Sequence, residues 1–98
     1  MRIKRTAASS ADIGRILNYY VDRDPAFASK LAESLERGLK QLSSFPHSGS
    51  SREYLMPGLR ALSRLDHIIF YIVRSDHILV LRVLHSRQDV AERLFEEP

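Results

Sequence analysis

The residues with the most chemical potential lie in one short stretch, ILVLRVLHSR (78–87), which contains Arg82, His85 and Arg87. Its aliphatic residues predict a strand that is buried on one or both faces. An arginine inside such a strand is costly unless an acid pairs with it or it opens onto a groove. The sequence therefore raises the question of what Arg82 binds.

Two interpretations of Arg82 stay open at this point. In the first, the side chain is partly buried and pairs with an acid such as Asp66 or Asp89. In the second, it projects into a groove beside Arg60 and binds an anion. On a regular strand, the period of two places Arg82 on one face with Ile78, Val80 and Leu84, and it places on the other face Leu79, Leu81, Val83 and His85.

The four histidines raise the question of metal or acid–base chemistry; they are His47, His67, His77 and His85. None has a metal-ligand spacing such as H-x-x-x-H, and the sequence has no cysteine or carboxylate cluster that would complete a ligand set. His85 could serve as a general base, although a strand-end histidine is more often held by a hydrogen bond. There is no G-x-S-x-G elbow and no glycine-rich phosphate loop. The sequence thus predicts no metal site, no cofactor and no recognisable catalytic set.

The first half of the sequence predicts a short strand over residues 3–6, followed by two amphipathic helices. Ser9 as N-cap, with Asp12 as its capping-box partner, predicts a first helix over about residues 10–22. Asp24-Pro25 begins the second, because proline lacks the amide proton that would be unsatisfied at that position. That helix is expected to extend to about residue 43. The short link between the helices requires an antiparallel hairpin.

The second half changes to a period typical of strands, over residues 59–64, 67–73 and 77–84. Residues 88–95 are compatible with a short final helix. The order β-α-α-β-β-β predicts a single α+β domain over residues 1–98, with the helical hairpin packed on one face of a small, mainly antiparallel sheet. The opposite face is expected to be open.

Composition places few limits on function. The net charge of +3 is compatible with nucleic acid or an acidic partner, but many proteins share it. The absence of cysteine fits a reducing compartment, and no apolar run approaches the length of a membrane span. A cytoplasmic protein without membrane contact is the expectation.

Four motifs follow the helical hairpin in a fixed order: FPHSG (45–49), PGLRAL (57–62), HIIFYIV (67–73) and LRVLHSRQD (81–89). In this order and spacing they resemble the ParE branch of the RelE/ParE toxin superfamily, over essentially the whole chain. The resemblance implies the toxin of a type II toxin–antitoxin pair, which inhibits DNA gyrase, blocks replication and growth, and has no enzymatic reaction of its own. It also implies a ParD-like antitoxin in a hetero-oligomeric complex, with operator binding supplied by the antitoxin.

Two alternatives remain beside this expectation. The RelE-like branch cuts messenger RNA on the ribosome, which requires a base, an acid and several cations around one phosphodiester. Arg60 and Arg82 resemble arginines on the concave face of that fold, and His85 could replace the base. However, no lysine follows Lys40 and no tyrosine follows the last strand. The other alternative is a degenerate, non-toxic module that binds an antitoxin.

The resemblance also suggests two sets of contact residues. A cationic rim at the end of the sheet would bind an acidic target surface or DNA backbone, and antitoxin carboxylates would neutralise it; its members are Arg60, Arg82, His85 and Arg87. The antitoxin is expected to contact the helical hairpin at Tyr19, Tyr20, Phe27, Leu31 and Leu35.

Overall fold

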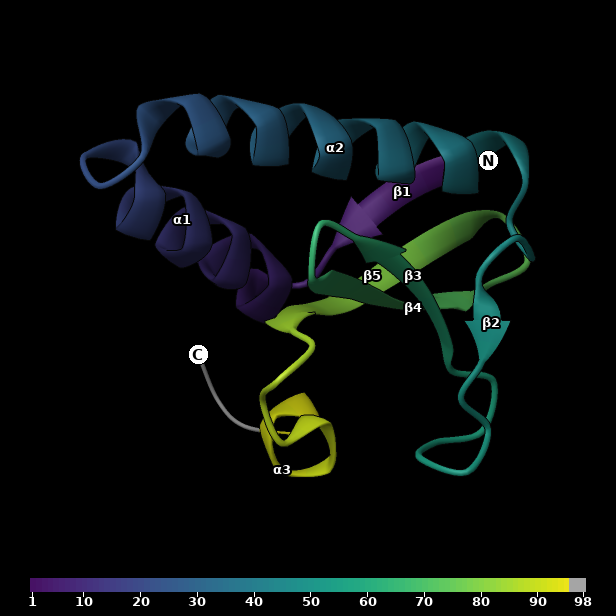
Figure 1. Ribbon diagram of the computed structural model, residues 1–98. Coiled ribbons are helices and arrows are strands. Elements are labelled where there is room, and N and C mark those ends of the chain that lie inside the picture. Colours follow the sequence, from purple (N-terminus) through teal and green to yellow (C-terminus); the bar gives the residue numbers. More distant parts are fainter. Residues whose placement is uncertain (96–98) are drawn as a thin grey trace.

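The computed structural model describes residues 1–95. Its elements are, in order, β1 (Arg2–Arg5), α1 (Ala7–Val21), α2 (Pro25–Ser44), β2 (Ser50–Ser51), β3 (Arg60–Arg64), β4 (His67–Val73), β5 (His77–His85) and α3 (Val90–Leu94). The strands form one sheet in the order β1-β5-β4-β3-β2, in which β1 is parallel to β5 and the other pairs are antiparallel. Figure 1 shows α1 and α2 over one face of the sheet and α3 on the opposite side. The predicted α+β class is confirmed. Within residues 1–95, no helix has the length and apolar character that a membrane span requires.

The start of α1 differs from the prediction. Thr6, not Ser9, is the N-cap: its hydroxyl accepts a hydrogen bond from the backbone N–H of Ser9 at 3.0 Å. The hydroxyl of Thr6 also donates to the carbonyl of Leu81 at 2.8 Å, which fixes the helix start against β5. The expected capping-box role of Asp12 is therefore wrong, since this residue lies in the second turn. By contrast, the predicted start of α2 is confirmed, with the Asp24 carboxylate accepting from the N–H of Phe27 at 3.1 Å.

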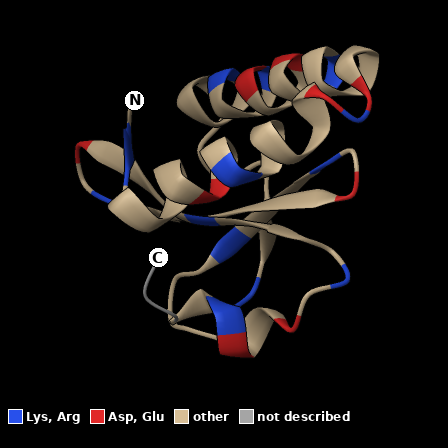
Figure 2. Ribbon diagram, turned by 90° about the vertical axis from the view of Figure 1, so that its left-hand side faces the viewer, with Lys and Arg blue, Asp and Glu red and all other residues tan. Residues whose placement is uncertain are grey.

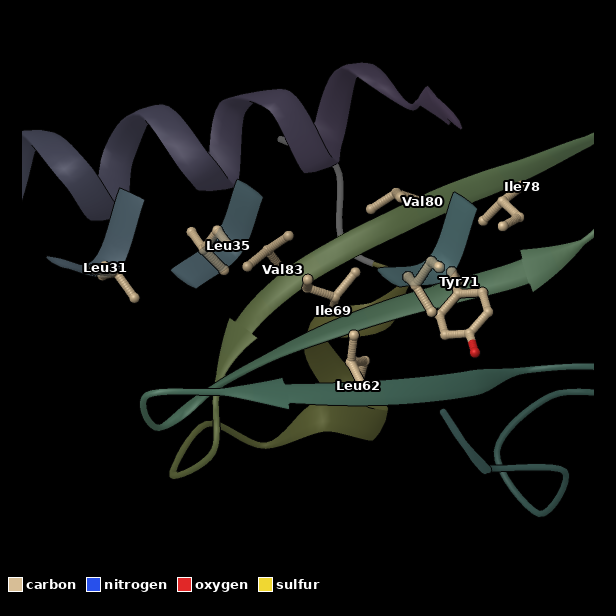
Figure 3. Packing of buried hydrophobic residues seen from close by; sticks show 9 residues of the cluster. Leu31, Leu35, Leu62, Ile69, Tyr71, Ile78, Val80 and Val83 are labelled. Carbon is tan, nitrogen blue, oxygen red and sulfur yellow. The ribbon is translucent and has the colours of Figure 1, made fainter. Parts of the chain in front are cut away.

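The main core lies between the helical hairpin and the sheet. Leucines at helical spacing on α2 pack against side chains from β3, β4 and β5 (Figure 3); the buried members are Leu31, Leu35, Leu42, Leu62, Ile69, Tyr71, Ile78, Val80 and Val83. Burying one such aliphatic side chain contributes roughly 1.5–3 kcal/mol. This cluster holds the sheet in a fixed position under the helices.

The opposite face of the sheet is covered, which corrects the prediction of an open face. A second cluster of Leu59, Ala61, Phe70, Leu84 and Leu94 lies there. Val90 of α3 and two residues of the 52–58 segment, Leu55 and Met56, pack against it. The sequence did not reveal this cover because a five-residue helix and an irregular loop carry no extended hydrophobic period.

A β-bulge changes which residues of β5 face the helices. Phe70 of β4 pairs with Arg82, while the next residue, Tyr71, pairs with Val80, so Leu81 is the extra residue. As a result Val83 joins Ile78 and Val80 in the main core, although a strict period of two placed Val83 on the opposite face. The bulge therefore reverses, from Arg82 onward, which side chains of β5 face the helices.

Candidate functional site

Arg82 is buried and pairs with Asp12 of α1. The Nε and Nη2 atoms of Arg82 each donate to one oxygen of the Asp12 carboxylate, both at 2.7 Å. The side chains are only 4% and 1% exposed. The third guanidinium nitrogen, Nη1, donates to the carbonyl of Arg93 on α3. Arg82 thus connects α1, β5 and α3, and the structure does not place it in an open groove.

Asp12 is the acid that the sequence did not identify. Besides Arg82, it accepts from the backbone N–H of Val83 at 3.0 Å and from the side chain of Arg15. The predicted partners have other positions: Asp66 lies in the turn before β4, and Asp89 caps α3 by accepting from the N–H of Glu92 at 3.2 Å. One signal was available, because an acid one residue before Ile13 lies beside the apolar stripe of the first helix.

Arg60 holds a loop instead of facing an open rim. Its Nη2 donates to the carbonyls of His47 and Gly49, at 2.9 and 2.6 Å. The hydroxyl of Tyr71 donates to the carbonyl of Pro46 at 2.8 Å and accepts from the N–H of Gly49 at 3.0 Å. A Cβ at Gly49 would lie 2.6 Å from that hydroxyl, so glycine alone fits. Three of the sequence motifs therefore meet in this contact, which we call the loop lock.

The four predicted rim residues do not form one continuous site. Arg60 and Arg82 lie on strands separated by β4, and each binds a different segment. His85 and Arg87 do lie together, because the backbone N–H of Arg87 donates to Nδ1 of His85 at 3.0 Å. Arg87 is exposed. Target binding by these residues stays a prediction, and exposed Arg87 is better placed for it than Arg60 and Arg82, whose guanidinium groups bind internal partners.

The five predicted antitoxin contacts fall into two groups. Tyr19, Tyr20 and Phe27 form a chain of edge-to-face rings at the tip of the helical hairpin, with centroids 5.0 and 4.8 Å apart. Tyr19 is 54% exposed, and the guanidinium of Arg23 lies 4.2 Å from its ring centre. Leu31 and Leu35 are buried in the main core, so neither is the exposed aliphatic residue that was expected.

A groove runs between the two helices and β1. It has a volume of about 410 Å³ and is lined by Ile3, Arg5, Ile13, Leu17, Leu35 and Leu39, together with polar Glu36. Leu35 therefore contributes to the floor of this groove although it is otherwise buried. Figure 2 shows basic residues along β1 and both signs of charge along α2, where Glu36 and Lys40 lie 3.7 Å apart. We call this groove of aliphatic and charged side chains the hairpin groove.

A second pocket, of about 320 Å³, lies between α1 and the end of the sheet where β4 begins and β5 ends. We call it the histidine pocket; its polar lining consists of Asp12, Arg15, Tyr19, Tyr20, His67, His85 and Gln88. His67 and His85 are paired across the two strands, with ring centres 5.1 Å apart and edge-to-face geometry. Burial lowers the pKa of His67, and the neighbouring His85 lowers it further, against the raising effect of its bond to the Leu65 carbonyl.

Known proteins resemble this chain along most of its length. The family model for the ParE toxin of the type II toxin–antitoxin system parDE matches residues 3–90. Toxin ParE3 of Caulobacter vibrioides is 30% identical over 94 residues, which cover 95% of this chain and 94% of that protein. Toxin ParE1 of Mycobacterium tuberculosis is 32% identical over 68 residues, covering 68% and 69%.

A solved structure gives the same result at the level of the fold. The chromosomal ParDE TA system from P. aeruginosa contains a chain that superposes with a TM-score of 0.73 at 26% identity, covering 87% of this chain and 95% of that one. On sequence and structure together, the chain belongs to the ParE toxin family of type II toxin–antitoxin systems.

Proposed function

We propose that this chain arrests growth by inhibiting DNA gyrase in the cytoplasm, and that a ParD-like antitoxin neutralises it in a hetero-oligomeric complex. The observation that carries the proposal is the family match over residues 3–90. In this proposal the chain acts by binding and performs no reaction of its own. The surfaces described above suggest how such binding would be divided.

The antitoxin is expected at the hairpin groove and the aromatic tip beside it. An amphipathic or extended segment can bury apolar side chains against Ile13, Leu17 and Leu39, while Arg5 and Glu36 meet charges at the rim. Tyr19 supplies an exposed aromatic ring, a residue type that often dominates interface energies. Removing it with Tyr19→Ala should weaken antitoxin binding by at least about tenfold, as a loss of 1.4 kcal/mol would.

Gyrase, or the DNA that it holds, is expected to contact the exposed end of β5. Arg87 offers an exposed cation there, next to His85. Arg74 is a matched control, because it is also an exposed arginine but lies in the hairpin turn at the other end of β5. Arg87→Ala should weaken gyrase inhibition while Arg74→Ala leaves it unchanged.

The deciding experiment adds the purified chain to gyrase, with and without its antitoxin, and resolves supercoiled, relaxed and linear DNA. Loss of supercoiling or accumulation of linear DNA, reversed by the antitoxin, supports the proposal. Normal gyrase activity with a preparation that still stops cell growth contradicts it. A preparation that affects neither gyrase nor growth would instead identify a non-toxic antitoxin-binding module.

A RelE-like, ribosome-dependent messenger RNA nuclease is the second candidate. The neighbouring rings of His67 and His85 in the histidine pocket favour it, because such chemistry needs groups that accept and donate protons. The contacts of Arg60 and Arg82 argue against the nuclease function, since both side chains already form hydrogen bonds within the protein. Cleavage of ribosome-bound messenger RNA by the parent chain, lost in His85→Ala, would favour this function over gyrase inhibition.

A further inference from the structure

The two rings of the histidine pocket are held in opposite tautomers by backbone groups. The Leu65 carbonyl can only accept, so its 2.9 Å contact fixes a proton on Nδ1 of His67 and leaves a lone pair on Nε2. The N–H of Arg87 donates to Nδ1 of His85 at 3.0 Å, so the neutral ring of His85 has its proton on Nε2. The pocket therefore contains one fixed acceptor and one fixed donor.

Gln88 adds a second donor to the same pocket. Its side-chain oxygen accepts from the backbone N–H of His85 at 2.7 Å, which assigns the orientation of the amide. The amide nitrogen is then left with two protons to donate. Among residues 1–95, the structure shows no hydrogen bond to this nitrogen or to either Nε2 atom. Three lining residues thus have fixed hydrogen-bonding roles, as two donors and one acceptor, whereas the hydroxyls of Tyr19 and Tyr20 can take either role.

This set of groups selects the chemistry of the ligand. Because burial lowers the pKa of His67, its ring is neutral near pH 7 and presents a lone pair. An anion such as phosphate would be repelled by that lone pair, so the ligand group that faces His67 must donate a hydrogen bond. The ligand groups that face His85 and Gln88 must accept hydrogen bonds. A planar edge with two acceptors and one donor satisfies all three.

We propose that the histidine pocket binds the base of a pyrimidine nucleotide through its Watson–Crick edge. Uracil and thymine offer two carbonyls and one N–H on this edge, and cytosine offers two acceptors and an amino group, whereas guanine offers one acceptor and two donors. The volume of about 320 Å³ lies at the lower end of the range for small-molecule sites, as a small ring requires. Arg15 is 62% exposed and bonds to Asp12 through Nη2, so its remaining donors can contact the phosphate. The inference does not rest on gyrase inhibition.

Imidazole-detected NMR on the full chain tests both the premise and the ligand. Long-range proton–nitrogen spectra should assign the Nδ1–H tautomer to His67 and the Nε2–H tautomer to His85. Titration with uridine monophosphate should shift the resonances of both rings. Guanosine monophosphate should bind at least about tenfold more weakly, and ribose 5-phosphate should leave both rings unshifted.

Substitutions locate the site. Gln88→Ala should weaken uridine monophosphate binding by roughly threefold to tenfold, the usual effect of one lost hydrogen bond. His85→Ala should weaken it at least as much. His77→Ala is the matched control, because His77 lies at the opposite end of β5, and it should leave binding unchanged.

Three results would overturn the inference. Equal shifts with ribose 5-phosphate would assign the pocket to a phosphate. Equal or tighter binding of guanosine monophosphate would contradict selection of a pyrimidine edge. Shifts produced as strongly by N-acetylglutamine amide would assign the pocket to an amide side chain of a protein partner.

Discussion

Arg82 and Arg60 come from two motifs of the same sequence and hold the fold in different ways. Arg82 binds a carboxylate through two parallel hydrogen bonds, and both side chains are almost completely buried. Arg60 is only partly buried and binds two neutral carbonyls through one nitrogen. Its Nε is buried without a hydrogen-bond partner among the described residues.

The difference shows what each arginine leaves behind when it is removed. Without Arg82, the Asp12 charge would remain buried and would lose two of its donors, which is a large penalty. Without Arg60, the carbonyls of exposed His47 and buried Gly49 would lose a donor, but no charge would be left buried. The same residue type in the same sheet therefore has a large structural role in one position and a smaller one in the other.

The largest expected effect comes from breaking the buried pair. Arg82→Ala should lower the free energy of unfolding by about 3–5 kcal/mol, because it leaves the Asp12 carboxylate buried with fewer partners. Denaturant unfolding followed by circular dichroism measures this change, with Arg74→Ala as the exposed arginine control. The double variant Asp12→Leu, Arg82→Met should recover much of the loss. A double variant that is less stable than Arg82→Ala would contradict the explanation.

A smaller effect is expected at the loop lock. Gly49→Ala places a Cβ 2.6 Å from the Tyr71 hydroxyl and 2.7 Å from the Ala61 carbonyl, so it should destabilise the fold by about 1–3 kcal/mol. Gly14→Ala is the matched control, because a Cβ there meets no atom within 4 Å inside helix α1. That change should stabilise the fold by roughly 0.5–1 kcal/mol. Equal unfolding midpoints for the two variants would exclude the close packing described here.

Arg60→Ala should have a smaller effect still, about 0.5–1.5 kcal/mol. Its two carbonyl partners belong to the loop of residues 45–49, so the loss should be local to that segment. Hydrogen exchange should show faster exchange of the Gly49 amide and unchanged exchange in β5. If the β5 amides also exchanged faster, to the same degree as the Gly49 amide, Arg60 would instead support the whole sheet, as Arg82 does.

The last and smallest expected effect is a pH dependence of stability that comes from His67 and from neither arginine. The pKa of folded His67 is lowered by burial below its ordinary value of 6.5, so the folded state binds fewer protons there than the unfolded state. Stability should therefore fall as the pH decreases from about 6.5 towards the lower folded pKa, and should be fully present above 6.5. His67→Gln should remove this part of the dependence. An identical pH profile in the variant would show that His67 does not carry it.

Much of the architecture could be predicted from local patterns. Asp24-Pro25 and the leucine spacing after it predicted α2, and the segment 67–73 corresponds to β4 without error. The final helix was also expected, although α3 is shorter than residues 88–95. Such elements are encoded by neighbours along the chain, which is why a pattern of a few residues reveals them. The N-cap Thr6 was missed because Ser9 offered an equally suitable hydroxyl.

By itself, the sequence determined the α+β class, the helical hairpin, the order of the strands along the chain and the motifs that resemble the ParE family. Only the tertiary structure decided which contacts the residues of those motifs make. Asp12 and Arg82 are 70 positions apart, and the bulge at Leu81 reverses the alternation that a strand normally provides. The histidine pocket likewise requires His67 and His85 to meet across two strands. Contacts between distant segments depend on register and packing in three dimensions, which no local period records.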